Sequence, residues 1–192
     1  MKPINFLLIV LLLCVSGRVS GADDFSFRNI RLGVSLDAQM KPCEHTRGSI
    51  EEKKVVCYEK GYLEASEQFR DYYLVDNLEE MEFYTSTMVV VLDGKIEKVD
   101  MSLWDDGADK LLALLKRKYG KPKSLRNYVI QNRMGAKFNQ YVATWRVKGC
   151  ELFLINRIGY GDHASFLITT AKYERYKRDL EKQKKKKDFD KL

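Results

Sequence analysis

The sequence predicts an α+β fold, in which an antiparallel sheet has helices packed on one face and a helical tail follows at the C-terminus. Three observations predict it. An Asp-Gly turn at 93–94 separates two runs of β-forming residues, 82–92 and 96–103. The segment 105–120 has the leucine spacing of an amphipathic helix. The later β-forming runs follow one another with short turns, which favours antiparallel pairing.

The first part of the chain is expected to hold short elements. Residues 25–32 predict one opening strand. Ser35 is a suitable N-cap for a short helix, which Pro42 would end. Residues 53–58 predict a further short strand. Between 61 and 81 the pattern fits a helix and a strand equally well.

The second part has stronger signals. Acidic residues at 105 and 106 open the helix, and Gly120 and Pro122 end it. Strands are expected at 123–131, 138–147, 151–158 and 165–170. A helix followed by strands thus occurs twice, over 35–103 and 105–170, which indicates a tandem helix-plus-sheet repeat.

The charge distribution divides the chain into three parts. Of 192 residues, 34 are Lys or Arg and 27 are Asp or Glu, a net charge of +7. Residues 1–22 hold two basic residues and no acid, and residues 172–192 hold ten basic and five acidic residues. Residues 23–171 hold 22 of each and are predicted to form a single domain. A formally neutral body argues against a nucleic-acid-binding protein.

The N-terminus predicts export. Lys2 precedes an unbroken apolar run, 6–15, and Ser20 and Ala22 are the small residues of a cleavage site after Ala22. A membrane anchor is the alternative, but ten apolar residues span about 15 Å of helix, half of a bilayer core. A lipidated Cys14 is disfavoured by the bulky Leu13 before it. We therefore expect a periplasmic or secreted protein, cleaved after residue 22.

Export makes a disulfide the expected state of the remaining cysteines. Cleavage leaves Cys43, Cys57 and Cys150, which allow three pairings. Cys43–Cys57 is favoured, since it closes a loop worth about 3 kcal/mol in the chain-entropy model. Cys150 begins an apolar segment, where a free thiol packs as a small hydrophobe. A covalent partner or dimer through this spare cysteine is the less favoured alternative.

Several short motifs resemble those of a known group of proteins. They are Ile30-Arg31-Leu32-Gly33-Val34-Ser35, Leu92-Asp93-Gly94-Lys95-Ile96, Lys118-Tyr119-Gly120-Lys121-Pro122, and Trp145 before Lys148-Gly149. Together they resemble small exported bacterial α+β domains of the β-lactamase-inhibitor-protein-like and SmpA/OmlA types, over roughly 25–170. The cysteine segment and the basic tail depart from that pattern. The resemblance implies binding to other proteins and no catalytic residue.

No motif of a catalytic, metal or cofactor site is present. Nucleophile elbows, zinc-protease helices, phosphate loops and dinucleotide fingerprints are all lacking. Two histidines are candidates for chemistry. His45 lies two residues from Cys43 and could form a metal site or a nucleophile pair with it. The predicted disulfide of Cys43 removes both options. His163 follows Asp162 in a glycine-bracketed segment, where a surface histidine is the simpler interpretation. We expect no enzyme activity, no metal and no cofactor.

Two groups of residues are candidates for binding. Aromatic side chains interleaved with charges are typical of protein interfaces, although many such tyrosines only complete a core. The candidate contact residues are Tyr58, Tyr62, Phe69, Tyr72 and Tyr73. The tail, predicted to be helical and frayed, carries the candidate membrane-surface residues Lys184, Lys185, Lys186 and Lys187.

Three functions follow, in this order of preference. The first is a protein-binding module of the cell envelope, such as an inhibitor, immunity protein or assembly factor. It predicts an exposed apolar patch with aromatic residues and no polar cleft. The second is a protein held at anionic membrane by its basic tail, with salt-sensitive binding that needs residues 172–192. The third is an enzyme of unrecognised type, with His163 or His45 beside a carboxylate in a pocket.

Overall fold

The computed structural model describes residues 25–43, 55–60, 71–76, 78, 84–158 and 163–189, and its α+β class confirms the predicted one. The predicted signal peptide, His45, Tyr62 and Phe69 lie outside these residues. The strands are β1 (Ser26–Phe27), β2 (Ile30–Arg31), β3 (Lys41–Pro42), β4 (Cys57–Lys60), β5 (Tyr72–Asp76), β6 (Tyr84–Leu92), β7 (Lys95–Trp104), β8 (Ser124–Gln131), β9 (Lys137–Val147), β10 (Cys150–Ile155) and β11 (His163–Thr170). The helices are α1 (Asp105–Tyr119) and α2 (Ala171–Phe189).

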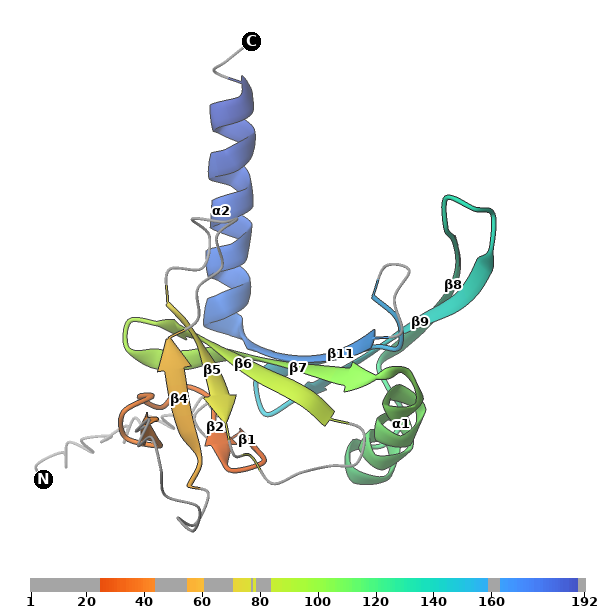
Figure 1. Ribbon diagram of the computed structural model, residues 1–192. Coiled ribbons are helices and arrows are strands. Elements are labelled where there is room, and N and C mark those ends of the chain that lie inside the picture. Colours follow the sequence, from red (N-terminus) through yellow and green to blue (C-terminus); the bar gives the residue numbers. More distant parts are fainter. Residues whose placement is uncertain are drawn as a thin grey trace, which may run out of the picture.

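One nine-stranded sheet organises the described part of the chain (Figure 1). The strand order is β3-β4-β5-β6-β7-β11-β10-β9-β8, and every pair except β3–β4 is antiparallel. The last strand, β11, lies between β7 and β10, with Ser165 opposite Ser102 and Ile168 opposite Leu152. It joins the hairpins of both halves into one sheet, whose outermost strands are β3 and β8.

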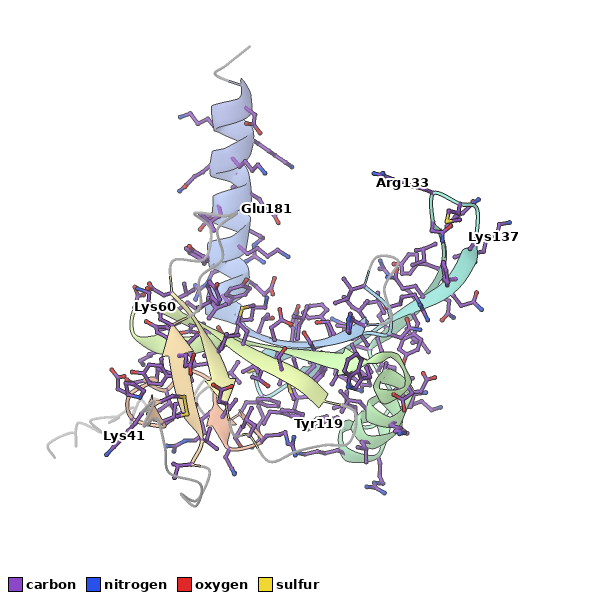
Figure 2. All side chains as sticks on the ribbon, viewed as in Figure 1. Lys41, Lys60, Tyr119, Arg133, Lys137 and Glu181 are labelled. Carbon is purple, nitrogen blue, oxygen red and sulfur yellow. A yellow bond between two sulfur atoms is a disulfide. The ribbon has the colours of Figure 1, made fainter. Side chains whose placement is uncertain are left out.

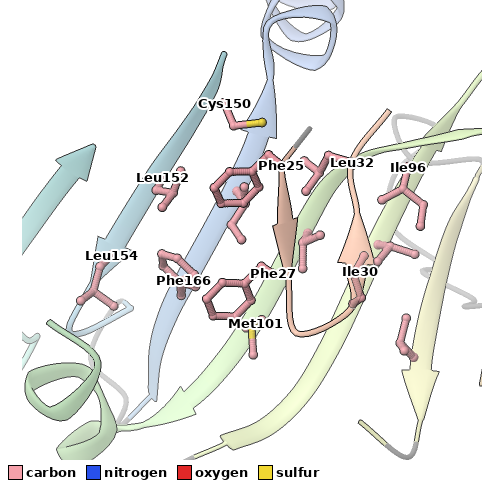
Figure 3. Close-up of a cluster of buried hydrophobic side chains, with 14 of the residues drawn as sticks. Phe25, Phe27, Ile30, Leu32, Ile96, Met101, Cys150, Leu152, Leu154 and Phe166 are labelled. Carbon is pink, nitrogen blue, oxygen red and sulfur yellow. The ribbon is translucent and has the colours of Figure 1, made fainter. Parts of the chain in front are cut away.

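The core lies on one face of this sheet, which we call the core face. Alternate residues of β7 and β11 point to it, among them Met101 and Phe166, which are at most 1% exposed. The β1–β2 ribbon packs onto them, and the rings of Phe27 and Phe166 lie 5.1 Å apart (Figure 3). Phe25 and Phe27 are both buried, at 2% and 8% exposed.

The helix α1 covers the rest of the core face. Leu111 and Leu115 are 2% exposed and belong to the main core cluster, and each buried leucine contributes about 2 kcal/mol. Basic residues fill the last turn, where they complement the helix dipole. Gly120 follows with a φ of 79°, as its predicted role as the residue that ends the helix requires.

Two local predictions in the first part of the chain are wrong. Residues 25–32 form the ribbon β1–β2 rather than one strand, because Arg28 and Asn29 both take positive φ, the geometry of a two-residue hairpin turn. The expected helix after Ser35 is a single turn, with the Met40 N–H bonded to the Leu36 carbonyl. Ser35 instead bridges to Lys95 of the sheet. The tandem repeat therefore lacks its first helix within the described residues.

The cysteines have the predicted arrangement. Cys43 and Cys57 form a disulfide, with their Cα atoms 5.0 Å apart. Cys150 is free and fully buried at the start of β10. Burial and, as the smaller cause, the nearby Glu97 carboxylate raise the pKa of its thiol to about 11. Cys150 is thus a packing residue with little thiolate at neutral pH.

Candidate binding surface

The face of the sheet opposite the core carries the candidate binding surface, and we call it the open face. Within the described residues, only the first turn of α2 packs on it. The sheet curves, so that the open face lies between α2 on one side and the β8–β9 hairpin on the other (Figure 1). One cross-strand row runs along it, formed by Leu74, Met88, Asp100, Leu167, Phe153 and Thr144.

Apolar side chains on this face are only partly covered. Leu74 is 42% exposed, and Met88, Phe153 and Leu167 are half-buried. Phe153 and Leu167 alternate with fully buried residues of the core face, so apolar side chains lie on both sides of the sheet at these positions. Covering such a surface with a partner is favourable, because it removes apolar area from water.

An aromatic pair lies at the end of the open face next to α1. Trp104 and His163 are register partners on β7 and β11, and their rings lie 5.2 Å apart. Trp104 is 51% exposed. Exposed tryptophans are common anchors in protein interfaces. Trp104 was not among the predicted contact residues, although its position between an amphipathic strand and the acidic helix start was a usable signal.

The polar groups at the centre of the open face are paired with one another. Ser165 donates a hydrogen bond to Asp100 over 3.1 Å, and the Lys98 ammonium lies 2.9 Å from the same carboxylate. His163 stacks on Trp104. The serine therefore bonds to an acid, rather than to the histidine that a nucleophilic site needs. This arrangement suits contact better than catalysis.

The base of α2 closes the other end of the open face. Tyr173 is 5% exposed and packs on Tyr72 and Val90. The Lys98 ammonium lies 5.8 Å from the centre of the Tyr173 ring. Burial, followed by the nearby acid Glu174, raises the pKa of Tyr173 to about 12. This packing fixes the direction in which the helix leaves the sheet.

An arginine-lined groove lies beside this helix base. It has a volume of about 580 Å³, and its lining includes Arg146, Glu151, Arg175 and Arg178. Arg146 is bonded to Glu151 across the β9–β10 hairpin. Glu174 also lines the groove, which therefore holds three arginines and two glutamates. No motif in the sequence marked this groove, because its two sides, 146–151 and 171–178, are 20 residues apart in the chain.

The predicted contact tyrosines that the structure describes do not form one surface. Tyr58 and Tyr73 pack edge-to-face on the core side, with ring centres 5.3 Å apart, whereas Tyr72 points to the opposite face. The Tyr58 hydroxyl donates to Asp37 over 2.6 Å, and this bond, with burial, raises the pKa of Tyr58 to about 12. All three support the fold; their role in binding stays a prediction, as does that of Tyr62 and Phe69.

The predicted membrane-surface lysines lie on α2, which extends away from the sheet (Figure 2). Lys184, Lys185 and Lys186 are exposed, and the Lys187 side chain lies outside the described residues. No helix in the described part of the chain is long and apolar enough to cross a membrane.

One cluster has the residue types of a metal site. Ligand atoms of Cys43, Glu59 and Asp76 lie within 4.8 Å of one another. The Cys43 sulfur is bonded to Cys57 and cannot act as a thiolate ligand, so two surface carboxylates remain. This cluster does not suit a tightly bound metal ion.

Comparison of the chain with known protein families, with curated proteins and with solved structures gives no match. The resemblance to small exported bacterial α+β domains stays a prediction that rests on the motifs above.

Proposed function

We propose that this chain is an exported, non-enzymatic protein-binding module of the cell envelope, and that it holds a partner protein on the open face of its sheet. The single observation that carries the proposal is the asymmetry of the sheet. One face is covered by α1 and the β1–β2 ribbon, whereas the other presents half-buried apolar residues and an exposed tryptophan. This agrees with the apolar aromatic patch expected of a binding module.

The polar groups support the same proposal. Asp100 forms an ion pair with Lys98 and accepts a hydrogen bond from Ser165, so the open face has no unpaired acid at its centre within the described residues. The Cys43–Cys57 disulfide is consistent with an oxidising compartment, as the predicted signal peptide requires. The resemblance to inhibitor and assembly domains implies the same class of function.

The test is site-specific photo-cross-linking in cells that produce the full chain. A photoreactive amino acid replaces Leu74 on the open face or, as a matched control, Leu114, which is 38% exposed on α1. We expect one stoichiometric protein adduct from position 74 and none from position 114. The substitution Trp104→Ala should then reduce this adduct at least tenfold.

Adducts from position 114 alone would place the contact on the helix side, where Leu111, Leu114 and Phe27 line a groove of about 470 Å³. The absence of any adduct from position 74, in cells where the protein is exported, would refute the proposal. Fractionation of the same cells tests export itself.

The basic tail supports a second candidate function, association with anionic membrane. In α2, residues 181–186 are exposed, and the helix leaves the sheet rather than lying along it (Figure 1). Each lysine near an anionic surface contributes about 1 kcal/mol of attraction. Binding to phosphatidylglycerol vesicles should fall with salt and disappear when residues 181–192 are removed. Salt-independent binding would contradict it.

A further inference from the structure

The strand β8 is an outer edge of the sheet and is exposed over nearly its whole length. In the described part of the chain it pairs with β9 only, from Ser124 opposite Thr144 to Gln131 opposite Lys137. Eight residues of strand are about 27 Å long. One side of this backbone therefore offers a row of N–H and C=O groups to another strand.

Apolar side chains accompany this free edge on both faces. Leu125 and Val129 point to the core-face side and are 45% and 66% exposed, beyond the cover of α1. Tyr128 points to the open-face side and is 43% exposed. A strand with β-forming residues that are exposed on both faces has the pattern of a sheet that lacks its next strand.

The charge around β8 is of one sign. From Lys110 to Cys150 the chain has eleven Lys and Arg residues and no Asp or Glu, so the formally neutral body is divided into a basic segment and an acidic remainder. Within the described residues, no carboxylate pairs with Lys121, Lys123, Arg126, Arg133 or Lys137. Arg133 and Lys137 lie at the projecting end of the hairpin (Figure 2).

We propose that β8 binds an extended, acidic segment of another protein, which adds a tenth strand to the sheet. The backbone of β8 would supply the hydrogen bonds, and alternate side chains of the segment would cover Tyr128 on one face and Val129 on the other. Acidic residues in the segment would pair with the basic residues beside the strand.

Two other occupants fit the surface less well. A second copy of the chain would bring two arginine-bearing strands together, and like charges opposite each other destabilise a strand pair. A lipid surface could not form hydrogen bonds with the free backbone N–H and C=O groups of β8. It would also contact apolar residues on one face of the strand, whereas β8 has them on both faces. An extended acidic segment would pair with the free backbone groups of β8, cover its apolar side chains on both faces and complement the basic residues beside it.

The inference rests on the proposed function in treating the chain as a binding protein, but it concerns a different surface. If no acidic peptide binds at β8 but the adduct at position 74 forms, this inference alone is overturned. If an acidic peptide binds at β8 but no adduct forms at position 74, the open-face proposal alone is overturned.

The test uses the protein isolated from cells that express the full chain, and a pool of random 12-residue peptides displayed on phage as the probe. Selection should enrich peptides in which apolar residues alternate with Asp or Glu and in which no proline interrupts the centre. Amide hydrogen exchange with an enriched synthetic peptide should then slow in β8 and stay unchanged in β3, the opposite edge.

Charge-reversal variants give the matched control. Arg126→Glu should weaken binding of the enriched peptide at least tenfold, because Arg126 is exposed on β8 itself. Arg126→Ala should weaken it less, and the salt dependence of binding should decrease in both. Lys182→Glu makes the same charge change on exposed α2 and should alter affinity less than twofold.

Three results would overturn the proposal. The first is enrichment of peptides without acidic residues, or equal binding by the Arg126→Glu variant. The second is a dimer in sedimentation experiments whose amide protection maps to β8. The third is binding to phosphatidylglycerol vesicles that Met134→Ser abolishes, since Met134 is 93% exposed at the hairpin tip.

Discussion

The side-chain hydroxyl of Thr170 donates a hydrogen bond to the carboxylate of Glu97, and both side chains are buried. The backbone N–H of Tyr173 donates to the same hydroxyl oxygen over 3.1 Å. The Lys172 ammonium lies 3.5 Å from Glu97 and 2.8 Å from Asp93. Thr170 thus caps α2 and joins its first turn to the β6–β7 hairpin, and this contact orients the helix that borders the open face.

Replacing Thr170 with valine should destabilise the protein by about 2 kcal/mol, because the buried carboxylate and the helix N-terminus both lose a partner. Thr169 provides a matched control. It is 3% exposed, and its hydroxyl has no hydrogen-bond partner among the described residues. Thr169→Val should therefore be neutral or stabilising by up to about 1 kcal/mol. Urea unfolding of both variants measures the difference, and equal costs would contradict the assignment of Thr170 as the cap.

The ion pair between Asp93 and Lys172 should make stability depend on pH at both extremes. The bond to Lys172 lowers the pKa of Asp93 below 3.8, so its contribution is present above about pH 4 and is lost as pH falls through the folded-state pKa. The bond to Asp93 raises the pKa of Lys172 above 10.5, so that contribution is present below about pH 10 and is lost as pH rises through the folded-state pKa.

Asp93→Asn should consequently reduce the loss of stability between pH 4 and pH 2, as measured by urea unfolding at each pH. Asp106 forms a surface pair with Lys110 on α1, and Asp106→Asn is the control. An unchanged acid profile in Asp93→Asn, or an equal change in both variants, would show that the pair has no such effect.

Local signals in the sequence were sufficient for much of the fold. The Asp93-Gly94 and Lys148-Gly149 turns have positive φ at both residues, as hairpin turns of two residues require. The helix 105–120 and the four strands that follow lie within a few residues of their predicted bounds. The opening ribbon was missed because Asn29 was not recognised as a residue that tolerates positive φ.

The binding surfaces depend on information that is not local. The pairing of β11 with β7 joins Ser165 to Ser102 across more than 60 residues, and it alone places Trp104 beside His163. The edge position of β8 likewise follows from the strand order and not from its own residues. The basic segment 110–150 could be identified from the sequence, but the net charge of residues 23–171 is zero because acidic residues on either side of the segment balance it.

The disulfide should stabilise the protein, and Cys150 should react only on unfolding. Replacing both Cys43 and Cys57 with alanine should lower the free energy of unfolding by about 3 kcal/mol, the value for a loop of this length. Cys150 is fully buried with a pKa of about 11, so iodoacetamide at pH 8 should not modify it in the native protein.

Mass spectrometry of the protein after alkylation checks both points. One added group after unfolding without a reductant, and three after unfolding with one, are expected for the chain cleaved after residue 22. Modification of Cys150 in the native state would show that β10 opens readily.

Trp145 should be the most important single contact between α1 and the sheet. Its indole N–H donates to the Gly120 carbonyl over 3.0 Å, and its side chain is 2% exposed. Trp145→Phe removes the bond and leaves space in the core, so we expect a loss of about 2 kcal/mol in urea unfolding. Trp104→Phe changes the same atoms at a position that is 51% exposed, and it should cost less than about 0.5 kcal/mol. Equal losses would mean that the bond to Gly120 does not hold the end of the helix to β9.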